Sequence, residues 1–141
     1  MRRTLLCGFL GLLLGSGAWA ADKTVSVSKS NAERGRYLVD FGGCADCHTP
    51  TLQTGEPDKT HWLKGAMLMF QPIHPIPNWK AASPDITPGG QIWTKWGEAG
   101  LMKFLETGVG PAGEKAGPPM PLYKLNSSDA KAIVAYLKTL K

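Results

Sequence analysis

The sequence predicts a small all-α domain that has three to five helices and one long, proline-rich loop. Apolar residues recur at helical spacing over three stretches, residues 30–42, 95–107 and 126–141. Between residues 71 and 92, five prolines exclude a long helix and a central strand. At 141 residues, 43% of them hydrophobic, the chain has the length and composition of one globular domain.

The first predicted helix leads directly into a pair of cysteines. Ser30 as N-cap and Glu33 three residues later form a capping box, and Gly42 ends the helix just before Cys44. The apolar residues expected on its inward face are Tyr37, Leu38 and Phe41.

The other two helices carry start and stop signals of the same kind. Thr94 is expected to cap a helix over residues 95–107, which Gly108 ends. Asn126 is expected to cap the last helix, with Asp129 in its first turn. Their predicted inward residues are Leu101, Phe104 and Leu105 in the first, and Ala130, Ile133, Leu137 and Leu140 in the second.

The N-terminus has the pattern of a secretory signal peptide. Arg2 and Arg3 precede an apolar run over residues 5–15, and the small-residue sequence AWA ends at Ala20. We expect cleavage after Ala20, which leaves residues 21–141 as the single mature domain in the periplasm. The alternative is a retained membrane anchor, although the run is short for a bilayer span.

Charge gives little support to nucleic-acid binding. The full chain carries a formal +5; removing Arg2 and Arg3 from its 16 basic residues leaves 14 against 11 acidic residues, or +3. The lysines are scattered, without a basic run and without interleaved aromatic residues, so no nucleic-acid partner is expected. A diffuse positive face that docks an acidic partner remains an alternative to an ordinary solvated surface.

The stretch GGCADCHTP places Cys44, Cys47 and His48 within five positions and allows three interpretations. Zinc needs about four ligands, and the twelve residues between His61 and His74 do not fit a finger, which expects three to five. A thioredoxin-like dithiol would follow a strand in a βαβ unit, whereas helical sequence precedes this motif.

The third interpretation, covalent haem attachment, uses every residue of the motif. The thiols of Cys44 and Cys47 would add to the two vinyl groups of the porphyrin, which places His48 at the iron as the proximal ligand. Such attachment takes place outside the cytoplasm, in agreement with the signal peptide. A bound haem c would also supply the apolar core that a small chain with a long loop lacks.

Met120 is the candidate for the opposite axial position. It lies in GPPMPLY, residues 117–123, where prolines on both sides stiffen the backbone. His74 is the main rival and would give a haem with two histidine ligands, and His61 is a further candidate. Packing in the core is the expected role of the remaining methionines, Met67, Met69 and Met102.

The motifs CADCH, PPMP and the terminal AIVAYLKTL give the chain a resemblance to the class I c-type cytochromes. That resemblance implies the class I cytochrome c fold around one haem, with the first and last helices crossing where Gly35 meets Tyr136. The stretch SPDITP, residues 83–88, and the sequence before Met120 are similar to cytochrome domains of bacterial membrane-bound alcohol, aldehyde and gluconate dehydrogenases. Those subunits usually carry three haem motifs, and this chain carries one.

These features predict a periplasmic, monohaem electron carrier of a respiratory chain, and not an enzyme. Histidine and methionine ligands close the coordination sphere, so the iron exchanges electrons without binding a reactant. The expected partners are redox proteins, a dehydrogenase or a terminal oxidase, with peripheral association with a membrane complex. Two alternatives remain: a fixed subunit of a dehydrogenase or oxidase complex, and an open-site haem sensor or peroxidase if Met120 is not a ligand.

Tryptophan is abundant around the long loop. Trp62, Trp79, Trp93 and Trp96 are expected to pack around the haem. The alternative is that Trp79 or Trp93 donates its indole N–H to a haem propionate.

Overall fold

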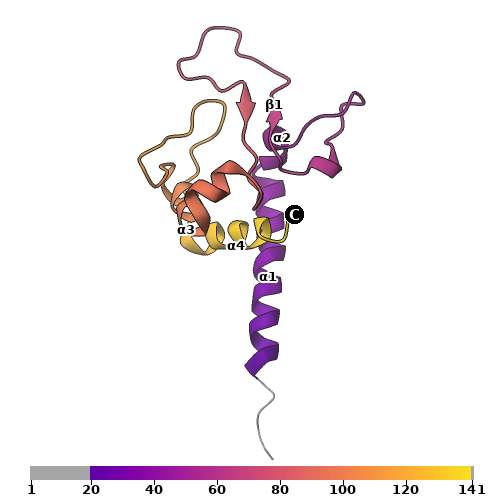
Figure 1. Ribbon diagram of the computed structural model, residues 1–141, viewed down its shortest axis with the longest axis vertical. Coiled ribbons are helices and arrows are strands. Elements are labelled where there is room, and N and C mark those ends of the chain that lie inside the picture. Colours follow the sequence, from indigo (N-terminus) through magenta and orange to yellow (C-terminus); the bar gives the residue numbers. More distant parts are fainter. Residues whose placement is uncertain (1–19, 141) are drawn as a thin grey trace, which may run out of the picture.

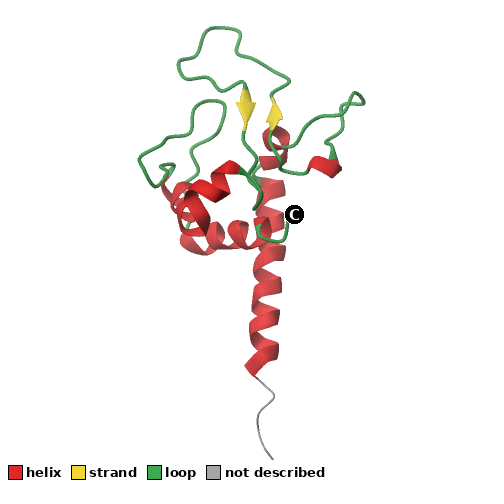
Figure 2. Ribbon diagram, in the orientation of Figure 1, coloured by secondary structure: helices red, strands yellow, loops and turns green. Residues whose placement is uncertain are grey.

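The computed structural model describes residues 20–140, which form a helical domain with one small antiparallel sheet (Figures 1 and 2). The all-α prediction is confirmed, with a two-stranded addition. Within the described part of the chain, no helix combines the length and the apolar character that a membrane crossing requires. The elements are α1 (Ala20–Phe41), α2 (Cys44–His48), the 3-10 helix η1 (Lys59–His61), β1 (Ala66–Met67), β2 (Ala82–Ser83), α3 (Gln91–Thr107) and α4 (Ser127–Leu137).

Helices α1 and α4 cross, and this contact forms the frame of the domain (Figure 1). The crossing depends on Gly35. A Cβ atom there would run into the carbonyl oxygen of Ala132 and would lie 2.8 Å from Cβ of Tyr136. The expected approach of Gly35 and Tyr136 is therefore confirmed, and it requires a residue without a side chain.

The inward face of α1 agrees with the prediction at Leu38, which packs against the core, and differs at Tyr37 and Phe41. Val39 is fully buried, whereas Tyr37 is 54% exposed and Phe41 is 79% exposed, their rings stacked on each other. The prediction failed because the close approach at Gly35 sets the rotation of α1, so Val39, four residues on, faces the core. The central core cluster consists of Val39, Ala45, Leu63, Ile133 and Leu137.

Two predicted helix starts are wrong. Helix α1 runs through Ser30, because no proline or glycine interrupts the preceding residues. Helix α3 begins after Gly90 instead of Thr94, whose hydroxyl donates a hydrogen bond back to the Gly90 carbonyl. A kink at Gly97, with φ 61° and ψ −174°, lies inside the predicted segment and divides α3 into two parts.

The other helix boundaries agree with the prediction. Gly108 ends α3 with φ 74°, and its N–H donates to the Phe104 carbonyl. Asn126 caps α4 through its side-chain oxygen, which accepts a hydrogen bond from the backbone N–H of Asp129. Inward residues of α4 are buried as expected at Ala130, Ile133 and Leu137, with Leu140 partly buried.

The proline-rich loop is closed at its base by the small sheet. Strand β1 pairs with β2 so that Ala66 faces Ser83 and Met67 faces Ala82. Residues 68–81 extend beyond this pair, away from the helices (Figure 2). Each strand has two residues, too few to produce an alternating pattern that sequence could reveal.

Candidate functional site

Helix α2 gathers the two thiols and the imidazole within about one helical turn. Gly43, directly before it, has φ 63°, a left-handed conformation that turns the chain from α1 into α2. Residues three and four apart on a helix share one face, so Cys44 lies on the same face as Cys47 and His48. Both thiols are free of a disulfide. The predicted attachment residues thus stand together at the end of α1 (Figure 1).

The imidazole of His48 is buried and oriented by a backbone carbonyl. His48 is 5% exposed, and its Nδ1 lies 2.8 Å from the carbonyl oxygen of Pro84. Because a carbonyl only accepts, Nδ1 carries the proton and donates, which leaves the lone pair on Nε2. Burial lowers the pKa of His48, so the ring is neutral at pH 7. A neutral ring with one nitrogen held is the state in which histidine ligates a metal.

The last carbonyls of α2 accept hydrogen bonds from Gly65, just before β1, and from Ser83 in β2. The Ser83 hydroxyl donates to the Cys47 carbonyl and accepts from the N–H of Ala66, 3.0 Å away. The Gly65 N–H donates to the His48 carbonyl at 2.8 Å. These bonds satisfy the helix end that a five-residue helix leaves unpaired. Ser83 therefore ties β1, β2 and the attachment motif together.

A second set of bonds holds the residue that follows the motif. Thr49 is 2% exposed, and its hydroxyl accepts from the N–H of Leu63 at 3.0 Å. Leu63 has φ 59° and is fully buried, and its carbonyl accepts from the N–H of Ile86 at 3.1 Å. Burial and two hydrogen bonds stabilise a conformation that is rare for leucine. The sequence carried no local signal for these contacts.

Burial raises the pKa of both thiols. For Cys44 the carboxylate of Asp46 adds to this effect, while the Tyr123 hydroxyl opposes it. For Cys47 burial is again the main cause, followed by Asp46. Burial, with the sulfur of Cys44 next in importance, raises the pKa of Tyr123 to about 12. The thiols and the phenol are therefore protonated at neutral pH.

Met120 is partly buried in a turn within residues 117–123. Its N–H donates to the carbonyl of Gly117 at 3.1 Å, and the N–H of Lys80 donates to the Pro118 carbonyl at 2.7 Å. The hydroxyl of Tyr123 donates to the carbonyl of Gly42 at 2.7 Å. The methionine segment therefore contacts both the proline-rich loop and the residue that leads into α2.

Among the other methionines and histidines weighed as ligands, Met102 is partly buried on α3, and the rest lie at the surface. Met67 is 69% exposed and Met69 is 78% exposed, so the prediction that they pack in the core is wrong. They belong to the sheet and loop that extend beyond the helices, where no second layer of described residues covers them. His74 is exposed in the same loop. His61 is also exposed, and its Nδ1 lies 2.7 Å from a carboxylate oxygen of Asp58.

Two tryptophans have indole partners that the sequence did not indicate. Trp62 donates to the Tyr136 hydroxyl at 3.0 Å, which fixes the start of the loop region to α4. Trp96 donates to a carboxylate oxygen of Glu114 at 3.3 Å. Trp93 packs against the core cluster and Trp79 lies edge-on to Phe70. A propionate contact from Trp79 or Trp93 stays a prediction.

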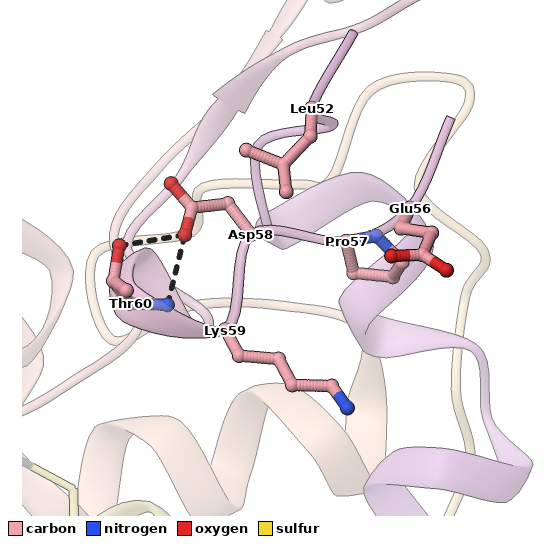
Figure 3. A pocket seen from close by; sticks show the side chains of 6 residues that line it. All are labelled: Leu52, Glu56, Pro57, Asp58, Lys59 and Thr60. Carbon is pink, nitrogen blue, oxygen red and sulfur yellow. Dashed lines mark hydrogen bonds between the residues drawn. The ribbon is translucent and has the colours of Figure 1, made fainter. Parts of the chain in front are cut away.

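A depression of about 420 Å³ lies apart from these residues, on the loop before η1 (Figure 3). Within it, the carboxylate of Asp58 accepts from the N–H of Thr60 at 2.8 Å and from its hydroxyl at 2.6 Å. These bonds are internal to the turn that caps η1. None of the predicted attachment or ligand residues is among its lining residues, which are Leu52, Glu56, Pro57, Asp58, Lys59 and Thr60.

The side chains around α2 fit a covalently attached haem. Two free, protonated thiols stand three positions apart, followed by a neutral imidazole with an available lone pair. An apolar macrocycle also needs apolar partners. The loop beside α2 leaves large apolar side chains exposed at Met67, Met69, Phe70, Ile73 and Ile76.

Comparison with known proteins also supports a covalently attached haem. Residues 32–141, more than half of the chain, match the family model described as cytochrome c, which implies a covalently bound haem c. The chain is 33% identical over 140 residues to a protein named diheme cytochrome c-type from Cereibacter sphaeroides, covering 95% of this chain and 43% of that protein.

Two further relatives are named as parts of dehydrogenases. One is a nicotinate dehydrogenase subunit of Pseudomonas putida, 33% identical over 147 residues, which cover 99% of this chain and 11% of that protein. The other is the fructose dehydrogenase cytochrome subunit of Gluconobacter japonicus, 34% identical over 114 residues, which cover 76% of this chain and 21% of that protein. The chain thus spans less than half the length of each of these three relatives.

Proposed function

The chain belongs to the cytochrome c family, and we propose that it transfers single electrons through a haem c held by Cys44 and Cys47, with His48 and Met120 as axial ligands. The bound haem would supply a one-electron couple between ferric and ferrous iron. The chain's own residues would attach the group, set its ligands and restrict access to the metal.

The observation that carries the proposal is the state of His48. Its Nδ1–H donates to the Pro84 carbonyl, and the ring is buried. The unprotonated Nε2 therefore has a lone pair that can ligate a metal. Because His48 directly follows Cys47, a macrocycle attached through both thiols would have its iron within reach of this nitrogen, which supports the proposal. A ring fixed in this way keeps its orientation in both oxidation states, which lowers the structural change that accompanies electron transfer.

Met120 is proposed as the second ligand because of how its segment is held. Residues 117–123 are tied to the proline-rich loop through Pro118 and to the end of α1 through Tyr123. A thioether ligand opposite histidine stabilises ferrous iron and raises the reduction potential. Exclusion of other ligands from a filled sixth position favours electron exchange over catalysis.

We further propose that the domain works outside the cytoplasm and receives electrons from a dehydrogenase. The predicted signal peptide, apart from its last residue Ala20, lies outside the described residues, so its cleavage stays a prediction. Two relatives are named as dehydrogenase subunits. These names support a fixed cytochrome subunit as the second candidate, next to a diffusing carrier, and co-purification from native membranes separates the two.

The test is an absorption spectrum of the full chain, co-expressed with a haem-attachment system and purified in both oxidation states. We expect a covalent low-spin haem with a far-red sulfur-to-iron band, which Met120→Ala abolishes. Met102→Ala serves as the matched control, because Met102 is partly buried on α3 and is not among the apolar side chains exposed beside α2, and it should keep the band. A wild type without the band would remove Met120 as the ligand and favour His74 or an open site.

A further inference from the structure

Met120 lies between two hydrogen bonds of different kinds. Two residues before it, the Pro118 carbonyl accepts from the backbone N–H of Lys80 at 2.7 Å. Three residues after it, the Tyr123 hydroxyl donates to the Gly42 carbonyl at 2.7 Å. The first bond joins two backbones and survives any side-chain exchange at these positions. The second depends on one phenolic oxygen.

The acceptor of the second bond belongs to the attachment region. Gly42 follows the last residue of α1, and a carbonyl at a helix end has no partner within the helix. A Cβ atom on Gly42 would lie 3.5 Å from the Tyr123 hydroxyl and 3.7 Å from the sulfur of Cys44. The hydroxyl therefore sits at the point where α1 delivers the chain to Cys44.

The neighbours of Tyr123 do not provide a substitute for this contact. Leu122 is 63% exposed and Lys124 is also exposed. The next backbone anchor is the N–H of Leu125, which donates to the Leu105 carbonyl at 3.1 Å, on the side of α3. Tyr123 is thus the residue that links the methionine segment directly to the cysteine motif.

We propose that Tyr123 is a positioning residue for the axial methionine. Its hydroxyl holds residues 117–123 against the start of the Cys44–His48 motif, which keeps Met120 at the iron when a competing ligand is present. This inference rests on the proposed ligation by Met120. Removing the hydroxyl keeps the aromatic ring but removes the hydrogen bond that joins residues 117–123 to Gly42.

The experiment compares wild type, Tyr123→Phe and the matched control Tyr37→Phe as full-length ferric proteins with haem attached. Tyr37 is 54% exposed on α1 and its ring contacts Phe41 and Arg34, so the control removes an exposed phenolic oxygen. Imidazole is titrated at pH 7, and the far-red band reports displacement of the methionine. Loss of one hydrogen bond should raise the imidazole affinity of Tyr123→Phe by about three- to tenfold. Tyr37→Phe should match wild type.

Thermal unfolding, followed by circular dichroism, separates positioning from plain stability. If Tyr123→Phe unfolds at a lower temperature but binds imidazole as wild type does, the hydroxyl is only structural and the inference is overturned. Equal imidazole affinities with an unchanged unfolding temperature overturn it as well. A wild type that lacks the far-red band contradicts the proposed ligation itself, and the role of Tyr123 falls with it.

Discussion

The histidine side and the methionine side of the site are built differently. On the histidine side, the chain returns twice to hold one short helix, through Gly65 and Ser83, and the Pro84 carbonyl holds the ring of a 5% exposed His48. On the methionine side, residues 117–123 cross a partly open surface with Met120 only partly buried.

This difference assigns separate tasks to the two sides. A side chain whose ring and backbone are both held cannot move without breaking several hydrogen bonds, so under the proposed ligation the histidine side would fix the position of the haem. A ligand on a segment held at few points can leave at the cost of about one hydrogen bond. Under the proposed ligation, the methionine side would therefore set how easily the sixth position opens.

The largest effect is expected from a substitution at the crossing of α1 and α4, on which both sides depend. Gly35→Ala places a Cβ against the Ala132 carbonyl and Tyr136, so α1 and α4 must separate. We expect the free energy of unfolding to fall by about 3 kcal/mol, the upper range for overpacking a close contact. Urea denaturation followed by circular dichroism measures it, and the far-red band should vanish together with the helical signal.

Gly89→Ala is the matched control for this substitution. A Cβ on Gly89 would meet nothing within 4 Å, and its backbone is not left-handed. The variant should stay within about 0.5 kcal/mol of wild type. A similar loss in both variants would mean that the close helix crossing does not set the stability of the domain.

A smaller effect is expected for Ser83→Ala, which should lower stability on the histidine side without changing the methionine side. Ser83→Ala removes the donor to the Cys47 carbonyl and the acceptor for the Ala66 N–H. Leaving partly buried polar groups unpaired costs about 1–3 kcal/mol of unfolding free energy. The imidazole affinity should stay at the wild-type value, because the methionine segment keeps all of its contacts. An increase in affinity as large as that expected for Tyr123→Phe would contradict the separation.

Ser128→Ala provides the control for the loss of a serine hydroxyl. Ser128 is exposed and donates to the Asn126 side chain at the start of α4, 2.6 Å away. Its removal should change the unfolding free energy by less than about 0.5 kcal/mol. The contrast with Ser83 tests whether burial at the attachment motif, and not the hydroxyl itself, carries the effect.

The sequence could predict features that depend on neighbouring residues, but not those that depend on contacts far apart along the chain. Helix ends at Gly108 and Asn126 were predictable because capping acts through residues adjacent in sequence. The attachment motif was visible because its chemistry fits within five positions. The buried face of α1 was not, since a contact with α4, far away along the chain, sets the rotation of the helix around Gly35.

The supports of the histidine were hidden for the same reason. Pro84 acts through its backbone carbonyl, and a carbonyl has no residue-specific signature in sequence. Ser83 and Thr49 are common residues whose roles depend on partners 36 and 14 positions away. Tyr123 stands in the same motif as Met120, yet its partner Gly42 is 81 positions away. Sequence patterns report neighbours along the chain, and these contacts join segments that only folding brings together.

The smallest expected effect uses acid to compare the two sides. Glu114, in the turn before the methionine segment, has its pKa lowered to about 2, mainly by Lys95 and then by backbone and Trp96 hydrogen bonds. Asp58, which caps η1 near the histidine side, has its pKa lowered to about 2 by Thr60 and His61. Both depressed values mean that the ionised form stabilises the fold.

The sign of the pH dependence follows from these values. The contribution of Glu114 is complete above its ordinary pKa of 4.5 and disappears as the pH falls to about 2. Glu114→Gln should therefore unfold at a lower temperature than wild type by a constant amount above pH 4.5, and the difference should vanish near pH 2. Asp58→Asn should behave in the same way, with the upper limit at its ordinary pKa of 3.8.

The strength of the far-red band at pH 5, compared between Glu114→Gln and Asp58→Asn, then distinguishes the methionine side from the histidine side. Glu114 accepts from the N–H of Ala112 at 2.9 Å and pairs with Lys95 at 2.7 Å, which fixes the turn leading into residues 117–123. Glu114→Gln should weaken the band slightly, whereas Asp58→Asn should leave it unchanged. Equal weakening in both variants would show that the methionine responds to the whole loop region, and the division into a fixed side and a compliant side would be wrong.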